Sequence, residues 1–294
     1  MALLEGRVAL VTGAGRGLGR AHALALAAEG AHVVVNDIGV TGDGHHSEDA
    51  MGVAALVVAE IVEAGGSAVA DTSDISDWAG AERAVATAIE AFGDLDVVVN
   101  NAGFLRDRAI VTMTEDDWDS VIRVHLKGHF AVTHWAAIHW RNAHKAGIER
   151  PRSLISTAST SGLFANPGQA NYGAAKSGIA SFSQIAAQEL ARYGVISNCI
   201  VPGARTRLTL AAPGLPEIME PTPGHFDQWD PANAAPLVVL LASPECRVNG
   251  ETFSIMGGMV QRMHPWATGE IVESAGPWTV ASLDAALRSM IDGE

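Results

Sequence analysis

The chain has 294 residues, 48% of them hydrophobic and 18% charged, and its formal net charge is −14 at pH 7. Such an acidic chain is unsuited to nucleic acid, whose phosphates require patches of Lys and Arg. It has no uncharged apolar run of about 20 residues, so we expect no membrane span. The N-terminus has no charged segment followed by a long apolar core, so we expect no signal peptide. Cys199 and Cys246 are expected to be free thiols, which favours a reducing, cytoplasmic location.

The first elements predict a dinucleotide site. Residues 7–12 form a short apolar run typical of a buried strand, and residues 20–29 are rich in Ala and Leu and predict a helix that ends at Gly30. Between them stand Gly13, Gly15, Gly17 and Gly19. Glycines at a strand-to-helix turn let the backbone approach a pyrophosphate, and the helix N-terminus offers N–H groups to it.

The next predicted strand, residues 31–36, ends at Asp37, about 20 residues beyond the glycines. A carboxylate at this point accepts hydrogen bonds from the adenosine ribose and repels a 2′-phosphate. It therefore favours NAD over NADP. Arg16 acts mildly in the opposite direction because a basic residue in this turn can meet that phosphate, but we expect Asp37 to dominate.

The remaining chain alternates predicted helices and strands. Expected helices are 47–64, 77–91, 114–142 and the Tyr172 helix to about residue 192; expected strands are 67–70, 95–100, 152–156, 195–201 and 251–255. This order predicts an α/β fold, a single-domain Rossmann-type doubly wound sheet of about seven parallel strands with helices on both faces. Residues 1–262 would form this domain. Residues 263–294 would be a C-terminal tail, in which Ser282–Ile291 has the spacing of a short amphipathic helix.

Tyr172 and Lys176 stand four residues apart, so they lie on one face of a helix. An ammonium group beside a phenol lowers its pKa from about 10, which would let Tyr172 exchange a proton with an alcohol or ketone. Ser159, thirteen residues before Tyr172, is the third member of the group.

These features resemble the short-chain dehydrogenase/reductase family. The matching motifs are Thr12-Gly13-x-x-x-Gly17-x-Gly19, Asp74-Ile75, Asn100-Asn101-Ala102-Gly103, Ser159–Tyr172–Lys176 and Pro202-Gly203, and together they span roughly residues 5 to 260. The resemblance implies hydride transfer between NAD(H) and a secondary alcohol or ketone, with Tyr172 exchanging the hydroxyl proton, Lys176 anchoring the nicotinamide ribose and Ser159 bonding the substrate oxygen. The implied cofactor-binding residues are Gly13, Arg16, Gly17, Leu18, Asp37, Asp74, Ile75, Asn101, Ala102, Gly103, Tyr172, Lys176, Pro202, Gly203 and Thr206.

Three segments depart from the family pattern. His125 replaces the usual Asn, whose backbone carbonyl holds a relay water, so His125 is either a packed helix residue or a catalytic member of the proton relay. The motif after Pro202-Gly203 is shortened, which makes Thr206 the expected nicotinamide contact. The loop 38–50 is long and contains His45 and His46, but adjacent rings point apart and no Cys supports them, so we expect no metal.

Within the family, the motifs are most similar to the (3R)-hydroxyacyl-CoA dehydrogenase unit of peroxisomal multifunctional enzyme type 2, a 17β-hydroxysteroid dehydrogenase type, and its bacterial stand-alone relatives. This resemblance predicts an acyl-CoA substrate. Arg106, Arg108, Arg205 and Arg207 lie beside motifs that border the cleft and could attract an anionic CoA, although loop charges such as Arg106 and Arg108 are more often solvated. The alternatives are a hydroxysteroid or another secondary alcohol and, remotely, a catalytically idle NAD-binding regulator. Family members are commonly tetramers, so we expect a homo-oligomer. Residues 205–229 are expected to form a mobile lid over the substrate.

Overall fold

The structure is a computed structural model that describes residues 2–45, 52–211, 215–264 and 266–292. Its contacts divide the chain into two units, Met1–Met263 and His264–Glu294. The first unit contains the sheet and every predicted site residue. The second contains one helix, α11 (Val280–Asp292), which agrees with the helix expected at Ser282–Ile291.

One sheet in the order β3-β2-β1-β4-β5-β6-β7-β8 forms the centre of the first unit. All neighbouring strands are parallel except β8, which is antiparallel to β7. The Rossmann-type sheet predicted from the sequence is thus confirmed, with eight strands where about seven were expected. The strands are β1 (Val8–Thr12), β2 (His32–Asn36), β3 (Ser67–Asp71), β4 (Val97–Asn100), β5 (Arg152–Thr157), β6 (Val195–Gly203), β7 (Thr252–Met256) and β8 (Met259–Met263).

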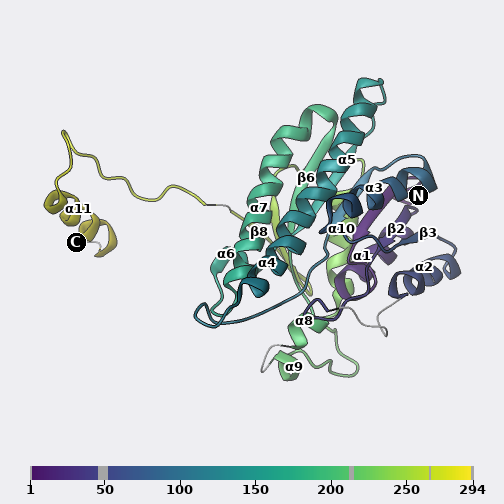
Figure 1. The fold of residues 1–294 in the computed structure, drawn as a ribbon, viewed down its shortest axis with the longest axis horizontal. Coiled ribbons are helices and arrows are strands. Elements are labelled where there is room, and N and C mark those ends of the chain that lie inside the picture. The colour runs from purple at the N-terminus through teal and green to yellow at the C-terminus, as the bar shows by residue number, and fades with distance from the viewer. Residues whose placement is uncertain (1, 46–51, 212–214, 265, 293–294) are drawn as a thin grey trace. The chain divides into compact units, whose positions relative to one another are not determined.

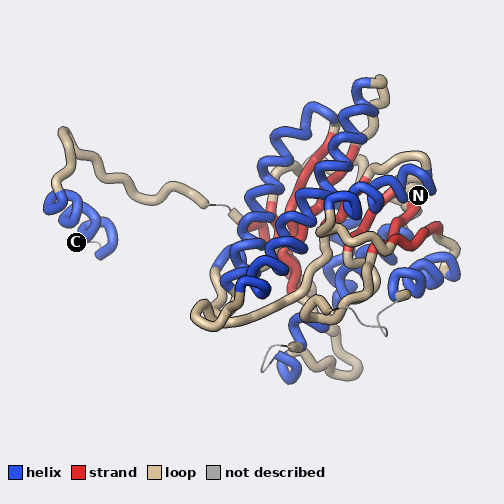
Figure 2. Tube along the Cα trace, in the orientation of Figure 1, coloured by secondary structure: helices blue, strands red, loops and turns tan. Residues whose placement is uncertain are grey.

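Helices cover both faces of the sheet (Figures 1 and 2). One apolar core joins the sheet to α1, α2 and α10, and a second joins it to α3, α5 and α7. Strand residues such as Leu154 and Ile155 alternate between the two cores, as the two-residue period of a strand requires. The helices are α1 (Gly17–Ala28), α2 (Val53–Glu63), α3 (Trp78–Phe92), α4 (Glu115–Ile122), α5 (Gly128–Lys145), α6 (Thr160–Phe164), α7 (Ala170–Leu190), α8 (Arg207–Leu210), α9 (Leu215–Ile218) and α10 (Ala235–Ala242).

The strand order reverses at β1, because the chain runs outward to β2 and β3 and then returns to β4 on the other side of β1. Ligands of open parallel sheets bind at such a switch point, beyond the carboxyl ends of the strands. The strands β1, β4 and β5 have their carboxyl ends at this edge of the sheet, at Thr12, Asn100 and Thr157. The fold therefore gathers the predicted motifs at one edge.

Two elements differ from expectation. The helix predicted over 114–142 is divided by a π-helical turn, Arg123–Lys127, between α4 and α5. The strand β8 was not predicted; it follows β7 after the Gly257-Gly258 turn and pairs back along it. The first part of the helix predicted from residue 47 lies outside the described residues, and the described part is α2.

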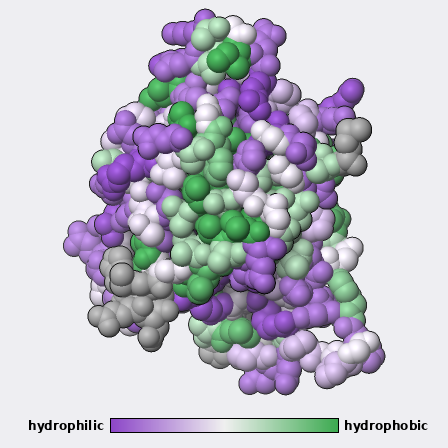
Figure 3. Space-filling model, turned by 90° about the vertical axis from the view of Figure 1, so that its right-hand side faces the viewer, coloured by the Kyte–Doolittle hydropathy of each residue, from purple (hydrophilic) through white to green (hydrophobic). Residues whose placement is uncertain are grey.

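The visible surface is mixed in character. Figure 3 shows one face on which apolar residues form a central area bordered by hydrophilic residues. Within the described ranges, none of the helices combines the length and apolar character needed to cross a bilayer.

Candidate active site

The turn between β1 and α1 is shaped by close backbone approaches. Gly13 has φ +63°, and a Cβ on it would lie 2.7 Å from the Cα of Ala102. A Cβ on Gly19 would lie 2.1 Å from the carbonyl oxygen of Gly13. The residue before α1, Arg16, makes no side-chain cap to the helix, and the first residues of α1, Gly17, Leu18 and Gly19, line the cavity. A helix N-terminus of this kind suits a phosphate.

Asp37 is fixed just beyond β2 by two backbone donors. The N–H of Gly15 donates to Oδ2 of Asp37 at 2.9 Å, and the N–H of Gly39 donates to Oδ1 at 2.8 Å. The carboxylate therefore has a defined position beside the glycine turn, as a ribose-binding acid requires. Two cations are close to it: the pKa of Arg207 is lowered by burial and by Arg16, whereas Asp37 raises it.

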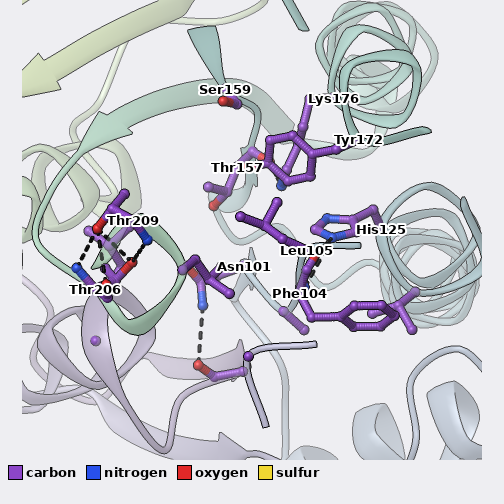
Figure 4. Close-up of a pocket in the computed structure, with 18 of the residues that line it drawn as sticks. Asn101, Phe104, Leu105, His125, Thr157, Ser159, Tyr172, Lys176, Thr206 and Thr209 are labelled. Carbon is purple, nitrogen blue, oxygen red and sulfur yellow. Dashed lines mark hydrogen bonds between the residues drawn. The ribbon is translucent and has the colours of Figure 1, made fainter. Parts of the chain in front are cut away.

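The loop after β4 is tied to β1 through Thr12. Its hydroxyl accepts hydrogen bonds from the N–H groups of Asn101 and Ala102 at 3.0 and 3.1 Å. The Asn101 side chain donates to the carbonyls of Thr12 and Gly13 at 3.0 and 3.2 Å (Figure 4). These bonds hold the 101–103 segment against the glycine turn.

The other predicted cofactor contacts line the same cavity. Asp74, after β3, accepts hydrogen bonds from the backbone N–H and the hydroxyl of Ser76 at 2.9 and 2.7 Å, and Ile75 follows it. Pro202 and Gly203 end β6. Thr206 caps α8 in a reciprocal capping box with Thr209, and its methyl group faces Gly17.

Ser159, Tyr172 and Lys176 come from the β5–α6 turn and from α7 (Figure 4). Ser159 caps α6 by accepting a hydrogen bond from the N–H of Ser161 at 3.2 Å, so it has a structural role as well as facing the cavity. Lys176 is buried, with its Nζ 5.5 Å from the centre of the Tyr172 ring, and it donates to the carbonyl of Thr157 at 2.6 Å.

The predicted tuning of Tyr172 by Lys176 is wrong for the protein alone. Burial raises the pKa of Tyr172 to about 12, the Ser159 hydroxyl lowers it, and Asp107 raises it further. Burial also lowers the pKa of Lys176 to about 8. The ammonium lies over the face of the ring, and desolvation of the phenol outweighs what the helix spacing alone suggested.

His125 lies on the π-helical turn and joins the β4 loop to Tyr172. Its Nε2 lies 2.8 Å from the carbonyl oxygen and 3.1 Å from the backbone nitrogen of Phe104. Its ring meets the Tyr172 ring edge-on, with centres 5.2 Å apart and an interplanar angle of 89°. Burial, and then the charge of Lys176, lower the pKa of His125 to about 3, so the ring is neutral. The structure shows His125 packed between Phe104 and Tyr172 in the cavity wall, and its part in a proton relay stays a prediction.

One cavity of about 1440 Å³ is lined by all of the site residues predicted from the sequence. Its wall also includes residues that sequence reasoning did not select. Asp107 accepts a hydrogen bond from Nε2 of Gln169 at 2.8 Å, and burial raises its pKa. Both stand within five residues of matched motifs, which was the available signal. Four of the eight methionines of the chain line the cavity too, namely Met219, Met256, Met259 and Met263.

The arginines near the cleft differ from one another. Arg106 is not a solvated loop charge, because it pairs with Asp116 and donates to the Ser120 hydroxyl at 3.0 Å. Arg205 pairs with Asp227 at 2.5 Å, and its backbone N–H donates to the carbonyl of Trp229 at 2.6 Å. The ion pair and the backbone hydrogen bond together connect the two ends of the predicted lid, residues 205–229. Arg108 is exposed and makes no ion pair within the described ranges.

The described residues contain no group of three or more His, Cys, Asp or Glu side chains placed to hold a metal. His46 and Asp49 of the long loop lie outside the described residues.

Comparison with known proteins decides the family. The family model for short chain dehydrogenases matches residues 7–210. The protein belongs to the short-chain dehydrogenase/reductase family. It is 42% identical over 294 residues to hydroxyacyl-CoA dehydrogenase ChsB1 of Mycobacterium tuberculosis, covering 99% of this chain and 90% of that one. It is 43% identical over 260 residues to peroxisomal multifunctional enzyme type 2 of Drosophila melanogaster, covering 88% of this chain and 40% of that one.

A solved structure agrees. The crystal structure of a short chain dehydrogenase from Mycobacterium avium is 45% identical, has a TM-score of 0.87, and matches 99% of this chain and 96% of that chain. As a short-chain dehydrogenase/reductase, the protein is an oxidoreductase that acts on CH–OH groups with a nicotinamide dinucleotide. The glycine turn, whose close approaches leave no room for side chains, fits such a cofactor.

Proposed function

We propose that the protein is an NAD-dependent 3-hydroxyacyl-CoA dehydrogenase. The observation that carries the reaction type is the single cavity in which Ser159, Tyr172 and Lys176 meet the glycine turn. The substrate class is supported by the relative named hydroxyacyl-CoA dehydrogenase, which this chain matches almost end to end.

Asp37 supports NAD over NADP. Its two oxygens are already held by backbone N–H groups, so the carboxylate cannot easily turn away from a 2′-phosphate. A phosphate there would face a fixed like charge, which costs several kcal/mol. Residues of the glycine turn would hold the pyrophosphate, and Asp74, Ile75 and the 101–103 segment would border the adenine and ribose.

The chain's own residues would perform the proton chemistry. When bound, the nicotinamide ring supplies the hydride acceptor. Tyr172 would take the hydroxyl proton at its phenol oxygen, and the Ser159 hydroxyl would donate to the substrate oxygen. Lys176 would hold the ribose with its two remaining donors. Because the pKa of Tyr172 is raised to about 12 in the protein alone, the phenol must lose its own proton before it can accept one. The positive charge of the nicotinamide ring of NAD, when bound, would favour that loss.

Exposed arginine favours a CoA ester over a free steroid. Arg106 and Arg205 are paired with carboxylates, but Arg108 and Arg207 are exposed and retain charge beside the cavity. Phosphates of CoA are partners for such cations. Homo-oligomerisation is supported by large apolar side chains that are exposed on α4, α5 and α7: Trp118, Phe130 and Ile185.

The decisive experiment is a spectrophotometric assay of NADH formation with 3-hydroxyacyl-CoA thioesters, free hydroxysteroids and simple secondary alcohols. We expect turnover with the thioesters; turnover with free steroids alone would support the alternative substrate, and no turnover with any class would support an idle regulator. Tyr172→Phe should lower kcat by about 10²–10⁴-fold while NAD still binds. The matched control is Tyr193→Phe, because Tyr193 is the only other tyrosine in the chain and lies outside the cavity.

A further inference from the structure

Asn171 immediately precedes Tyr172 in the first turn of α7 and is fully buried. Its Nδ2 donates to the carbonyl of Arg106 at 3.0 Å and to the carbonyl of Asp117 at 2.9 Å. Its Oδ1 accepts a hydrogen bond from the backbone N–H of Tyr172 at 2.7 Å. Both donors of the amide and its oxygen are therefore in use. One side chain joins α7 to α4 and to the loop that follows β4.

The start of α7 depends on this side chain. The first N–H groups of a helix have no acceptor within the helix. Gln169, the residue before α7, makes no side-chain cap within the described part of the chain, and its amide donates instead to Asp107 at 2.8 Å. Asn171 supplies the acceptor for the N–H of Tyr172 from inside the first turn. This bond fixes the backbone of the tyrosine.

The carbonyl of Arg106 is a fixed acceptor, because the side chain of the same residue is held from two directions. Its guanidinium pairs with Asp116 on α4, and its Nε donates to the carbonyl of Asp43 at 3.1 Å. Asp43 belongs to the loop after β2 and lines the cavity. Through Arg106, Asn171 therefore connects the backbone of Tyr172 to the cofactor side of the cavity.

The ring of Tyr172 is positioned by a separate contact. It meets the His125 ring edge-on, with centres 5.2 Å apart (Figure 4). That contact limits the tilt of the ring, but the depth to which the phenol oxygen reaches into the cavity also depends on where the first turn of α7 lies. A displacement of about 1 Å at a reacting group can cost about 10²-fold in rate.

We propose that Asn171 is a positioning residue, which sets the reach of the Tyr172 phenol into the cavity by tying the first turn of α7 to α4 and to the loop after β4. It lies behind the cavity wall, so it acts through Tyr172 and not on the substrate. The effect on turnover rests on the proposed function, whereas the effect on the tyrosine ring does not.

Two substitutions separate the bonds of Asn171. Asn171→Asp keeps the shape and the acceptor for the N–H of Tyr172 but removes both donors. Asn171→Ser, which introduces no charge, removes the donors and shortens the side chain. The joined segments also meet nearer the surface, where the N–H of Arg108 donates to the carbonyl of Gly168 at 2.8 Å, so we expect both variants to fold.

The chain offers a direct spectroscopic measurement, because it has two tyrosines, Tyr172 and Tyr193. Protein labelled with ¹³C in the tyrosine rings gives two sets of NMR signals, and Tyr172→Phe identifies the set of interest. The ring current of His125 shifts the signals of Tyr172. We expect both variants at position 171 to move the Tyr172 signals toward those of an unstructured tyrosine and to leave the Tyr193 signals in place.

The matched control is Asn198→Ser on β6. Asn198 is 1% exposed, its Nδ2 donates to the carbonyl of Val248 at 2.7 Å, and its Oδ1 accepts from the N–H of Glu251 at 3.1 Å. It is thus a buried amide of the same kind that lies outside the cavity wall. This variant should leave the Tyr172 signals unchanged.

Kinetics give the second readout. Both variants at position 171 should lower kcat by roughly 10–100-fold, while the KM for substrate and the Kd for NADH change little. Tyr172 signals that stay in place in Asn171→Asp and Asn171→Ser, or that move equally in Asn198→Ser, would overturn the proposal. Normal kcat in both variants would overturn it as well. A wild-type protein that turns over no thioester contradicts the proposed function alone, because the NMR signals need no substrate.

Discussion

The imidazole of His125 occupies the space that any side chain at Gly103 would need. A Cβ on Gly103 would lie 2.1 Å from Cε1 and 2.8 Å from Nδ1 of His125. Gly103 of the Asn-Asn-Ala-Gly motif and His125, which replaces the family's asparagine, therefore pack directly against each other. The His125 ring also contacts the ring of Tyr172, so a change at Gly103 should displace both rings.

Gly103→Ala should therefore destabilise the protein by about 1–3 kcal/mol through overpacking and should reduce kcat, because the Tyr172 ring would be displaced. Denaturant unfolding and steady-state kinetics measure the two effects. Adding His125→Asn should restore part of both losses because the smaller side chain makes room. Gly269→Ala, at a position where a Cβ meets nothing within 4 Å, is the control. Equal losses in the single and double variants would contradict the packing relationship.

Asp37→Ser should change cofactor preference. It removes the fixed carboxylate and leaves Arg16 and Arg207 beside the ribose position, so the KM for NADP should fall by about tenfold or more while that for NAD rises. Initial rates with both cofactors give the ratio. Asp43→Ala removes a nearby carboxylate that bonds Thr41 and should leave the ratio unchanged. A ratio unaltered by Asp37→Ser would exclude this carboxylate as the selecting group.

Lys176→Met should inactivate the protein and stabilise it. Burial lowers the pKa of Lys176 to about 8 from an ordinary 10.5, so the folded state holds this proton less firmly than the unfolded state. The resulting penalty is full below pH 8 and disappears as the pH rises to 10.5. We expect a gain of roughly 1–3 kcal/mol near neutral pH that shrinks across this window.

Unfolding free energies measured by denaturant titration from pH 7 to pH 10 test the Lys176 prediction. Lys145→Met replaces an exposed lysine on α5 and should give no pH-dependent gain. A variant at position 176 less stable than the wild type at pH 7 would show that the cation is well accommodated.

Arg205→Met should make the 205–229 segment, the predicted lid over the substrate, more mobile. The Arg205 and Asp227 side chains are each 23% exposed, so water screens the pair and the loss of stability should be small. The main effect should be a several-fold higher KM for substrate with kcat little changed, because the 205–229 segment loses the bond between its ends. Arg262→Met breaks a comparable pair with Glu251 outside the cavity and serves as control. An unchanged KM would show that the segment is held by other contacts.

The sequence was sufficient where a short local pattern determines the structure. The glycine turn, the position of Asp37 and the alternation of strands and helices depend on neighbours in the chain, and each was predicted. The strand β8 could also have been found, since Gly257-Gly258 between apolar runs is a hairpin signal.

Other features depend on tertiary packing and have no local signature. Nothing in Arg123–Lys127 distinguishes a π-helical turn from a regular helix. The pKa of Tyr172 was predicted in the wrong direction because helix spacing shows which residues share a face but not how much water reaches the phenol. The Arg205–Asp227 pair joins residues that no periodicity connects.

That pair has an evolutionary consequence. Contacts of Arg205 with Asp227 and Trp229 hold the two ends of the 205–229 segment together. The residues between them can therefore be inserted, deleted or substituted without displacing those ends or the cofactor-binding side of the cavity. New specificities could then arise by exchanging this one insert, with the reaction chemistry inherited intact.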